Sequence, residues 1–168
     1  MRARELTPPA SIRRAATPAD MDEARALFRE YADWLAVDLC FQGFAEELAT
    51  LPGAYAPPRG CLLLAGPAGA AIGCIALRPL AVDGAPDGTI GEIKRLFVKS
   101  AARGQGLGER LVAAIVDIAR ASGYRELKLD TLEHMTDARR LYERLGFAPC
   151  SPYYHNPLPG AVYLSRTL

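Results

Sequence analysis

Residues 103–108 read Arg-Gly-Gln-Gly-Leu-Gly, which places three glycines in five positions beside an arginine. This stretch joins an expected strand, Thr89–Val98, to an amphipathic segment that closes at Gly123 and is an expected helix. Glycine lets the backbone take positive φ and approach a ligand closely. The helix N-terminus presents free N–H groups, and Arg103 adds a positive charge. We therefore predict a site for phosphate or pyrophosphate.

Two common nucleotide-binding loops do not fit this stretch. The P-loop pattern needs Gly-Lys followed by Ser or Thr, and that sequence is absent from the chain. The dinucleotide pattern G-x-G-x-x-G, started at Gly104, meets Glu109 at its sixth position. Both patterns are therefore excluded as the source of the phosphate site.

Outward from the loop, apolar periodicity and turn residues predict one α/β domain over residues 11–168, preceded by a loose tail over residues 1–10. Thr17 is expected to cap the first helix, with Asp20 three residues later. Thr136 or Asp137 is expected to cap the last helix, which ends at Gly146. The remaining expected elements are strands over 12–15, 61–65, 71–77, 89–98, 126–132 and 162–168, and helices that carry Met21–Leu35, Phe41–Leu48 and Leu107–Ala119.

Composition limits the functions that are open to the chain. Its 168 residues suit one domain, and 20 basic against 19 acidic residues give a net charge of +1, which does not favour a nucleic-acid or membrane partner. The four cysteines and two histidines form no zinc-ligand spacing, so we expect no metal. The longest uncharged run, Cys61–Leu77, is too short for a bilayer and is broken by Gly66 and Pro67. We expect a cytoplasmic protein.

Two motifs in the right order resemble those of the GNAT acetyltransferase family. The spacing R-x-x-G-x-G, formed by Arg103, Gly106 and Gly108, resembles the family's acetyl-CoA-binding motif. The stretch Ala138–Phe147 is similar to its A-x-x-L-Y-E-x-L-G-F helix end. The resemblance implies a mixed, mostly antiparallel central sheet with helices on both faces, in an α/β (α+β) fold over residues 11–168.

By this resemblance the co-substrate is acetyl-CoA. Its pantetheine arm would pair with the backbone of one strand, and its pyrophosphate would lie on the amides of the glycine loop beside Arg103. The implied binding residues are Leu96, Phe97, Val98, Arg103, Gly104, Gln105, Gly106, Leu107 and Gly108.

The resemblance also implies catalytic roles. Tyr142 stands where the family has a phenol that donates a proton to the leaving thiolate, although it could simply pack beside Leu141 and Leu145. Glu92 is the best candidate for a base that acts through a water, with pairing to Lys94 or Arg125 as the structural alternative. Weaker candidates for the base are Asp130, Thr131 and His134. Met135 stands where the family often has an asparagine that contacts CoA.

We predict that the acceptor enters opposite CoA, between the first two helices and the late loops. Aromatic residues there suit a small-ligand pocket: Tyr31, Trp34, Phe41 and Tyr154. Acidic residues of the helix pair would suit an ammonium group: Asp33, Asp38, Glu46 and Glu47.

The resulting function is an N-acetyltransferase that acts on the primary amine of a small molecule, amino acid or peptide. Two alternatives stay open, namely a non-catalytic acyl-CoA-binding module and a transferase of another acyl group. Dimers are common among proteins that resemble this one, so a homodimer is a further expectation.

Overall fold

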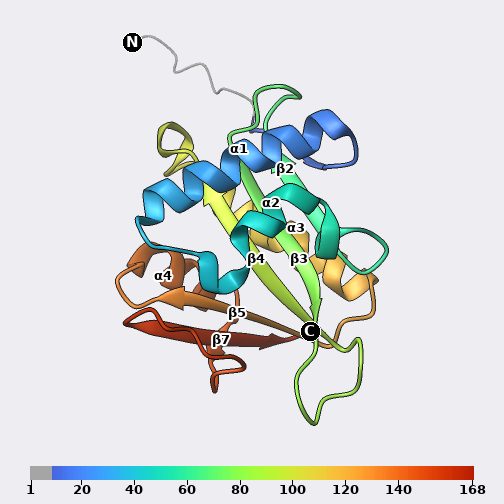
Figure 1. Ribbon diagram of the computed structural model, residues 1–168, viewed down its shortest axis with the longest axis vertical. Helices are drawn as coiled ribbons and strands as arrows, with labels where there is room; N and C mark the ends of the chain where they lie inside the picture. The colour runs from blue at the N-terminus through green and yellow to red at the C-terminus, as the bar shows by residue number, and fades with distance from the viewer. Residues whose placement is uncertain (1–8) are drawn as a thin grey trace, which may run out of the picture.

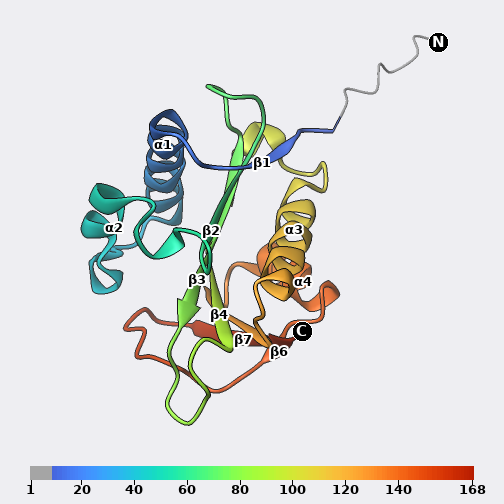
Figure 2. The same cartoon turned by 90° about the vertical axis from the view of Figure 1, so that its right-hand side faces the viewer.

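The computed structural model describes residues 9–168, so the first eight residues of the expected tail lie outside the described part of the chain. A seven-stranded sheet lies between two layers of helix, with α1 and α2 on one face and α3 and α4 on the other (Figures 1 and 2). The helices are α1 (Pro18–Leu35), α2 (Phe44–Thr50), α3 (Leu107–Ala121) and α4 (Thr136–Arg144). None of them is long and apolar enough to cross a membrane.

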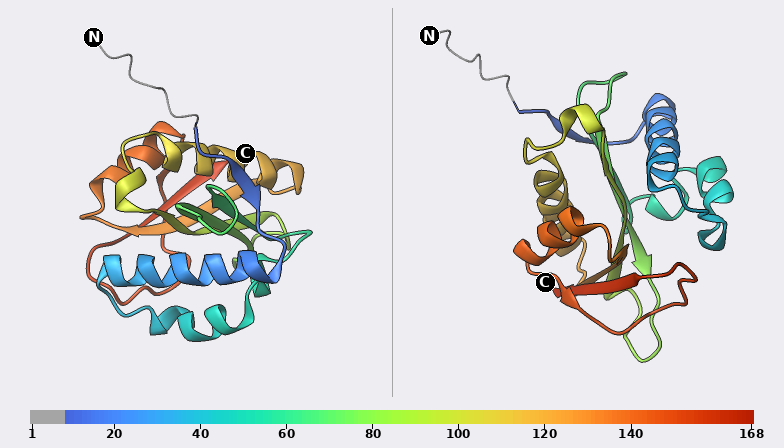
Figure 3. Two further views of the ribbon diagram at one scale, coloured as in Figure 1. Left: turned by 90° about the horizontal axis from the view of Figure 1, so that it is seen from above. Right: turned by 90° about the vertical axis from the view of Figure 1, so that its left-hand side faces the viewer.

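The strand order is β1-β2-β3-β4-β5-β7-β6, and every neighbouring pair is antiparallel except β4 and β5. This confirms the mixed, mostly antiparallel sheet with helices on both faces, which Figure 3 shows from two further sides. The strands are β1 (Ile12–Arg14), β2 (Cys61–Ala65), β3 (Gly73–Leu80), β4 (Ile90–Val98), β5 (Glu126–Leu132), β6 (Ala148–Pro149) and β7 (Ala161–Thr167).

Alternating residues of the central strands divide the core into two clusters. On β2, Leu63 packs beneath α3, whereas Leu62 and Leu64 pack beneath α1. Both faces of β2 are buried, which explains why its sequence is a continuous apolar run. Burial on both faces fixes the register of the sheet, because a slip of one residue would exchange the two sets of side chains.

Local signals predicted most element ends. The expected cap of α1 is confirmed: the Thr17 hydroxyl accepts a hydrogen bond from Asp20 N at 3.2 Å, and the Asp20 carboxylate accepts from Thr17 N at 2.9 Å. Four details differ. The strand β3 spans Gly73–Leu80, so it begins two residues later and ends three residues later than the expected strand over 71–77. Residues Cys40–Gln42 form a separate 3₁₀ turn, and Gly43 in the left-handed region divides it from α2. The cap of α4 is Met135, with no side-chain hydrogen bond, so Thr136 or Asp137 as cap was wrong. The two-residue strand β6 was not expected.

Candidate functional site

The glycine loop has the geometry of an anion cradle. Gly106 is the N-cap of α3 with φ of 73°, and Gly104 has φ of 77°. A Cβ atom at either position would meet no protein atom within 4 Å, so the backbone conformation, and not packing, demands glycine there. Within residues 9–168 the N–H groups of Gly104, Gln105 and Gly106 have no protein acceptor, and those of Leu107 and Gly108 lie in the open first turn of α3.

A groove of about 510 Å³ runs from this loop between β4 and α4; we call it the glycine-loop groove. Its lining includes Leu96, Phe97 and Val98 of β4, together with Arg103, Gly104, Gly106, Leu107 and Gly108. The exposed side chain of Trp34, from the end of α1, also lines it. The Arg103 guanidinium lies 4.6 Å from the centre of the Trp34 ring, and its Nε donates to the Val98 carbonyl at 2.9 Å. Arg103 is therefore held in place at the mouth of the groove.

The edge of β4 is exposed along this groove because the sheet opens there. The strand β5 pairs with β4 only over Ile90–Glu92. Farther along, Cys74 and Ala76 of β3 lie opposite Phe97 and Lys94, so β4 carries one extra residue and bulges. Arg95 sits in the bulge with φ of 60°. The gap between β4 and β5 leaves backbone groups of β4 that an extended ligand could pair with.

A cavity of about 60 Å³ lies within this gap; we call it the central cavity. It shares Leu96, Met135 and Ala138 with the glycine-loop groove. The buried ring of Tyr142 lines it and packs edge-on against Phe147 at 5.6 Å between ring centres. Among residues 9–168 no group hydrogen-bonds the Tyr142 hydroxyl, and the residue lines the cavity. Burial raises the pKa of this phenol, so the hydroxyl keeps its proton at neutral pH and is available as a hydrogen-bond donor to a group in the cavity.

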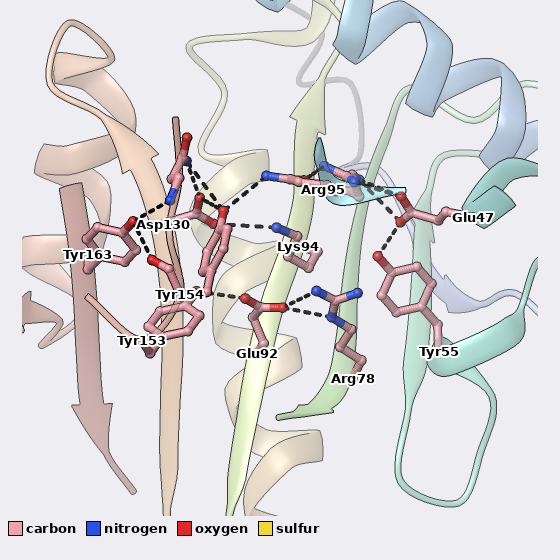
Figure 4. Close-up of polar contacts among 12 residues, drawn as sticks. Glu47, Tyr55, Arg78, Glu92, Lys94, Arg95, Asp130, Tyr153, Tyr154 and Tyr163 are labelled. Atoms are coloured by element: carbon pink, nitrogen blue, oxygen red, sulfur yellow. Dashed lines mark hydrogen bonds and ion pairs between the residues drawn. The ribbon is translucent and has the colours of Figure 1, made fainter. Parts of the chain in front are cut away.

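On the other side, the central cavity meets a pocket of about 270 Å³ that we call the aromatic pocket. Its walls are Phe41, Gln42, Arg78, Leu80, Glu92, Lys94, Tyr153 and Tyr154, and it shares Gln42 and Lys94 with the central cavity. These side chains come from strands and loops that are far apart in the sequence, and Figure 4 shows how most of them point toward one another across β4 and β5.

The buried carboxylate of Glu92 is held by two neighbours. Arg78, its cross-strand partner on β3, donates to Glu92 Oε1 from Nε at 2.7 Å and from Nη2 at 2.6 Å. The Tyr153 hydroxyl donates to Oε2 at 2.7 Å. The expected structural partners Lys94 and Arg125 were wrong, because Arg78 lies directly opposite in the antiparallel register.

A second set of polar contacts surrounds Asp130 (Figure 4). Its Oδ2 accepts from Asn156 Nδ2 at 2.8 Å and from the Tyr154 hydroxyl, and its Oδ1 lies 3.4 Å from Lys94 Nζ. Burial lowers the pKa of Lys94, and the nearby Asp130 carboxylate opposes that shift.

Glu47 of α2 pairs with the buried Arg95, whose Nη2 donates to Glu47 Oε2 at 2.6 Å, and Glu47 also accepts from the Tyr55 hydroxyl. Glu47 is therefore not the free negative charge that we expected beside an ammonium group. Its carboxylate instead neutralises the arginine of the β4 bulge.

Comparison with known proteins places this geometry in a family. A sequence model of the acetyltransferase (GNAT) family matches residues 17–147. The chain belongs to the GNAT acetyltransferase family. It is 39% identical over 155 residues to an uncharacterized N-acetyltransferase of Schizosaccharomyces pombe, covering 92% of each chain. It is 40% identical over 116 residues to an IAA acetyltransferase of Azospirillum brasilense, covering 67% of this chain and 71% of the relative.

Solved structures agree with this assignment. A candidate acyl-CoA N-acyltransferase from Klebsiella pneumoniae superposes with a TM-score of 0.70 at 29% identity, covering 95% of this chain and 97% of the other. An acetyltransferase from Streptococcus agalactiae superposes with a TM-score of 0.75 at 21% identity, which shows the fold, and covers 96% of this chain and all of the other. The protein is thus a GNAT acyltransferase, and its fold implies an acyl-CoA co-substrate.

The glycine-loop groove of this GNAT protein fits such a co-substrate. The amides of residues 104–108 and Arg103 would hold the pyrophosphate, and the open edge of β4 would pair with the pantetheine arm. Met135, which replaces the family's asparagine, lines both the groove and the central cavity. The chain's single asparagine, Asn156, lies on Asp130 instead.

The structure separates the aromatic residues that we predict to contact the acceptor. Phe41 and Tyr154 line the aromatic pocket, Tyr31 lines the central cavity, and Trp34 lies in the glycine-loop groove. Among the weaker candidates for the base, Thr131 lines the central cavity, whereas His134 is exposed in the turn after β5.

Sequence reasoning did not assign Arg78 or Lys94 to the site. Arg78 is the one charged residue of β3 and follows Leu77, and Lys94 follows Ile93 in β4, which also holds Glu92 and Arg95. Charged residues are rarely buried without a partner, so this placement was a signal that could have found them.

Proposed function

We propose that this GNAT protein transfers an acetyl group from acetyl-CoA to the primary amine of a small molecule, amino acid or peptide. The observation that carries the proposal is the central cavity, which borders the glycine-loop groove at Leu96 and the aromatic pocket at Lys94 and is lined by the Tyr142 ring. A thioester in the groove and an amine in the pocket would meet there.

Bound acetyl-CoA supplies an activated acyl group. The neutral amine nitrogen forms a bond to the acyl carbon while the bond from that carbon to sulfur breaks. Tyr142 donates its phenolic proton to the leaving thiolate, and the proton that the nitrogen sheds as the amide forms returns through water to the Tyr142 phenolate. Glu92 accepts the proton that the ammonium loses, through a water on a lone pair that Arg78 and Tyr153 leave free. The products are an amide and free CoA.

The test measures CoA thiol release over a panel of primary amines with the full chain. We expect release with at least one amine, and we expect Tyr142→Phe to lower kcat by about 100-fold while the Kd for CoA stays the same. Tyr124→Phe is a matched control, because its hydroxyl donates only to the Arg59 carbonyl, at 2.7 Å, outside the three cavities.

Tight CoA binding without thiol release on any amine would favour the acyl-CoA-binding module. Faster release from another acyl-CoA would favour the other transferase. An unchanged kcat in Tyr142→Phe would remove the phenol from the mechanism.

A further inference from the structure

Lys94 is a buried charged group of the site to which the proposed reaction gives no task. Its side chain is 5% exposed, and it borders both the central cavity and the aromatic pocket. An ammonium group has three N–H donors, yet within residues 9–168 the only acceptor for Lys94 is Asp130 Oδ1, at the long distance of 3.4 Å. A buried charge that is so weakly paired is costly unless something else binds it.

The carboxylates around the aromatic pocket have little capacity left for a ligand. Asp130 Oδ2 already accepts from Asn156 and Tyr154. Glu92 accepts from Arg78 and Tyr153 on its two oxygens. The carboxylates of Glu92 and Asp130 thus face protein hydrogen-bond donors (Figure 4).

The basic side chains, in contrast, keep donors that face the pocket. Lys94 retains N–H groups beyond its contact with Asp130, and Arg78 uses Nε and Nη2 on Glu92 while its Nη1 has no partner among residues 9–168. Phe41, Tyr153 and Tyr154 supply apolar walls around these donors. A pocket with spare cationic donors, whose carboxylates already accept most of the hydrogen bonds they can, is complementary to a ligand that carries an anion.

We propose that Lys94 binds a carboxylate of the acceptor, so that the preferred acceptor is an amino acid whose amine lies close to that carboxylate. The inference rests on the proposed function, because it takes the aromatic pocket as the acceptor site. Lys94 borders the cavity that Tyr142 lines, so a carboxylate on Lys94 keeps the neighbouring amine at the entrance to that cavity. Arg78 is placed to contact a second polar group of the acceptor.

The experiment compares amino acids with the amines that remain when the carboxylate is removed, such as phenylalanine with phenethylamine and tryptophan with tryptamine. We expect kcat/KM to be at least about 10-fold higher for the amino acid, since a hydrogen bond to a charged group contributes about 1.5 kcal/mol or more. In Lys94→Met the ratio should fall to about 1, mainly through KM of the amino acid, and Lys94→Arg should restore part of it. Lys128→Met, which removes the partner of Glu126 on β5, is the matched control and should keep the ratio.

Two additions keep the result interpretable. The double variant Lys94→Met with Asp130→Asn removes both charges, so a fold damaged by an unpaired Asp130 is distinguished from a lost binding group. In a binding arm that needs no turnover, phenylalanine should raise the Tm of the CoA-saturated wild type and leave that of the double variant unchanged.

Equal kcat/KM for both members of each pair, or an equal loss on both in Lys94→Met, would overturn the assignment of Lys94. A preference for phosphoethanolamine over every amino acid would also overturn it, in favour of a phosphate. Absence of thiol release with all amines would contradict the proposed function alone, because the binding arm would still decide whether Lys94 holds a carboxylate.

Discussion

The glycine-loop groove and the aromatic pocket meet at the central cavity but are built in different ways. The groove offers backbone groups from contiguous stretches, namely the amides of residues 104–108 and the open edge of β4. The pocket offers side chains from separate segments, such as Arg78 of β3, Lys94 of β4 and Tyr153 of the loop before β7, and both Arg78 and Tyr153 donate to Glu92. Binding through backbone groups depends little on which side chains are present. Binding through side chains changes its preferred ligand when those side chains are substituted.

The largest effect should come from filling the backbone cradle. Gly106→Val adds a branched side chain where the amides are free, and the loss of about three charge-assisted hydrogen bonds predicts a CoA Kd raised about 1,000-fold. Calorimetric titration with CoA measures it. Gly84→Val is the control, because Gly84 also has positive φ, at 82°, with no atom within 4 Å of a Cβ, but lies in the loop between β3 and β4. Equal CoA affinity in the two variants would contradict the cradle.

The second substitution asks whether the aromatic pocket carries chemistry as well as binding. Glu92→Gln keeps the shape and an acceptor for Arg78 but cannot take a proton, so kcat should fall about 100-fold, the lower end for a general base. The measurement is kcat as a function of pH. If Glu92 is the base, the fall of kcat at low pH seen in the wild type should be absent in Glu92→Gln. Glu126→Gln, which removes a partly exposed carboxylate paired with Lys128, should leave the profile unchanged. A change in acceptor KM with an intact pH profile would reduce Glu92 to a positioning residue.

A smaller effect is expected where a side chain supports the groove. Trp34→Ala removes the ring on which Arg103 lies, and an exposed cation–π contact of about 0.5–1 kcal/mol predicts a CoA Kd raised about 2- to 5-fold. Trp34→Phe should recover most of the affinity. If the acceptor KM rises while the CoA Kd does not, Trp34 belongs to the acceptor side, as the sequence predicted.

The smallest functional effect is expected at the start of α1, far from both regions. Hydrogen bonds from Ala16 and Thr17 N–H, each 2.9 Å, together with Arg13, hold the pKa of Asp20 well below its usual range. A lowered pKa means that the charge stabilises the fold fully above about pH 4, the usual aspartate pKa, and that this stabilisation is lost as the pH falls further.

Asp20→Asn should therefore lower the free energy of unfolding in urea at pH 7, and the deficit should narrow between pH 4 and pH 3. CoA Kd and acceptor KM should stay constant. Asp22→Asn, which removes an exposed carboxylate of the same helix, should change stability little. A deficit that does not depend on pH would show that the capping geometry matters and the charge does not.

The sequence predicted the features that depend on neighbouring residues and missed those that depend on contacts between distant segments. The glycine loop, the cap of α1 and the strand β5 depend on residues that are neighbours in the chain, so spacing alone located them. The pairing of Glu92 with Arg78 depends on the register between β3 and β4, which no local pattern specifies. The bulge at Arg95 is equally invisible in the sequence, because the residue is not glycine although φ is 60°.

The β4 bulge divides the strand into two parts that line different cavities, and this matters for how the enzyme can evolve. Residues before it, Glu92 and Lys94, point their side chains into the aromatic pocket, whereas Leu96 and Val98 after it line the glycine-loop groove. On the proposed function, substitution of Lys94 changes acceptor preference without altering the co-substrate. Deletion of Arg95, the residue between Lys94 and Leu96, would instead remove the bulge and change the register of β4 against β3. The part of β4 that faces the aromatic pocket and the part that lines the glycine-loop groove are thus separated by the single residue Arg95.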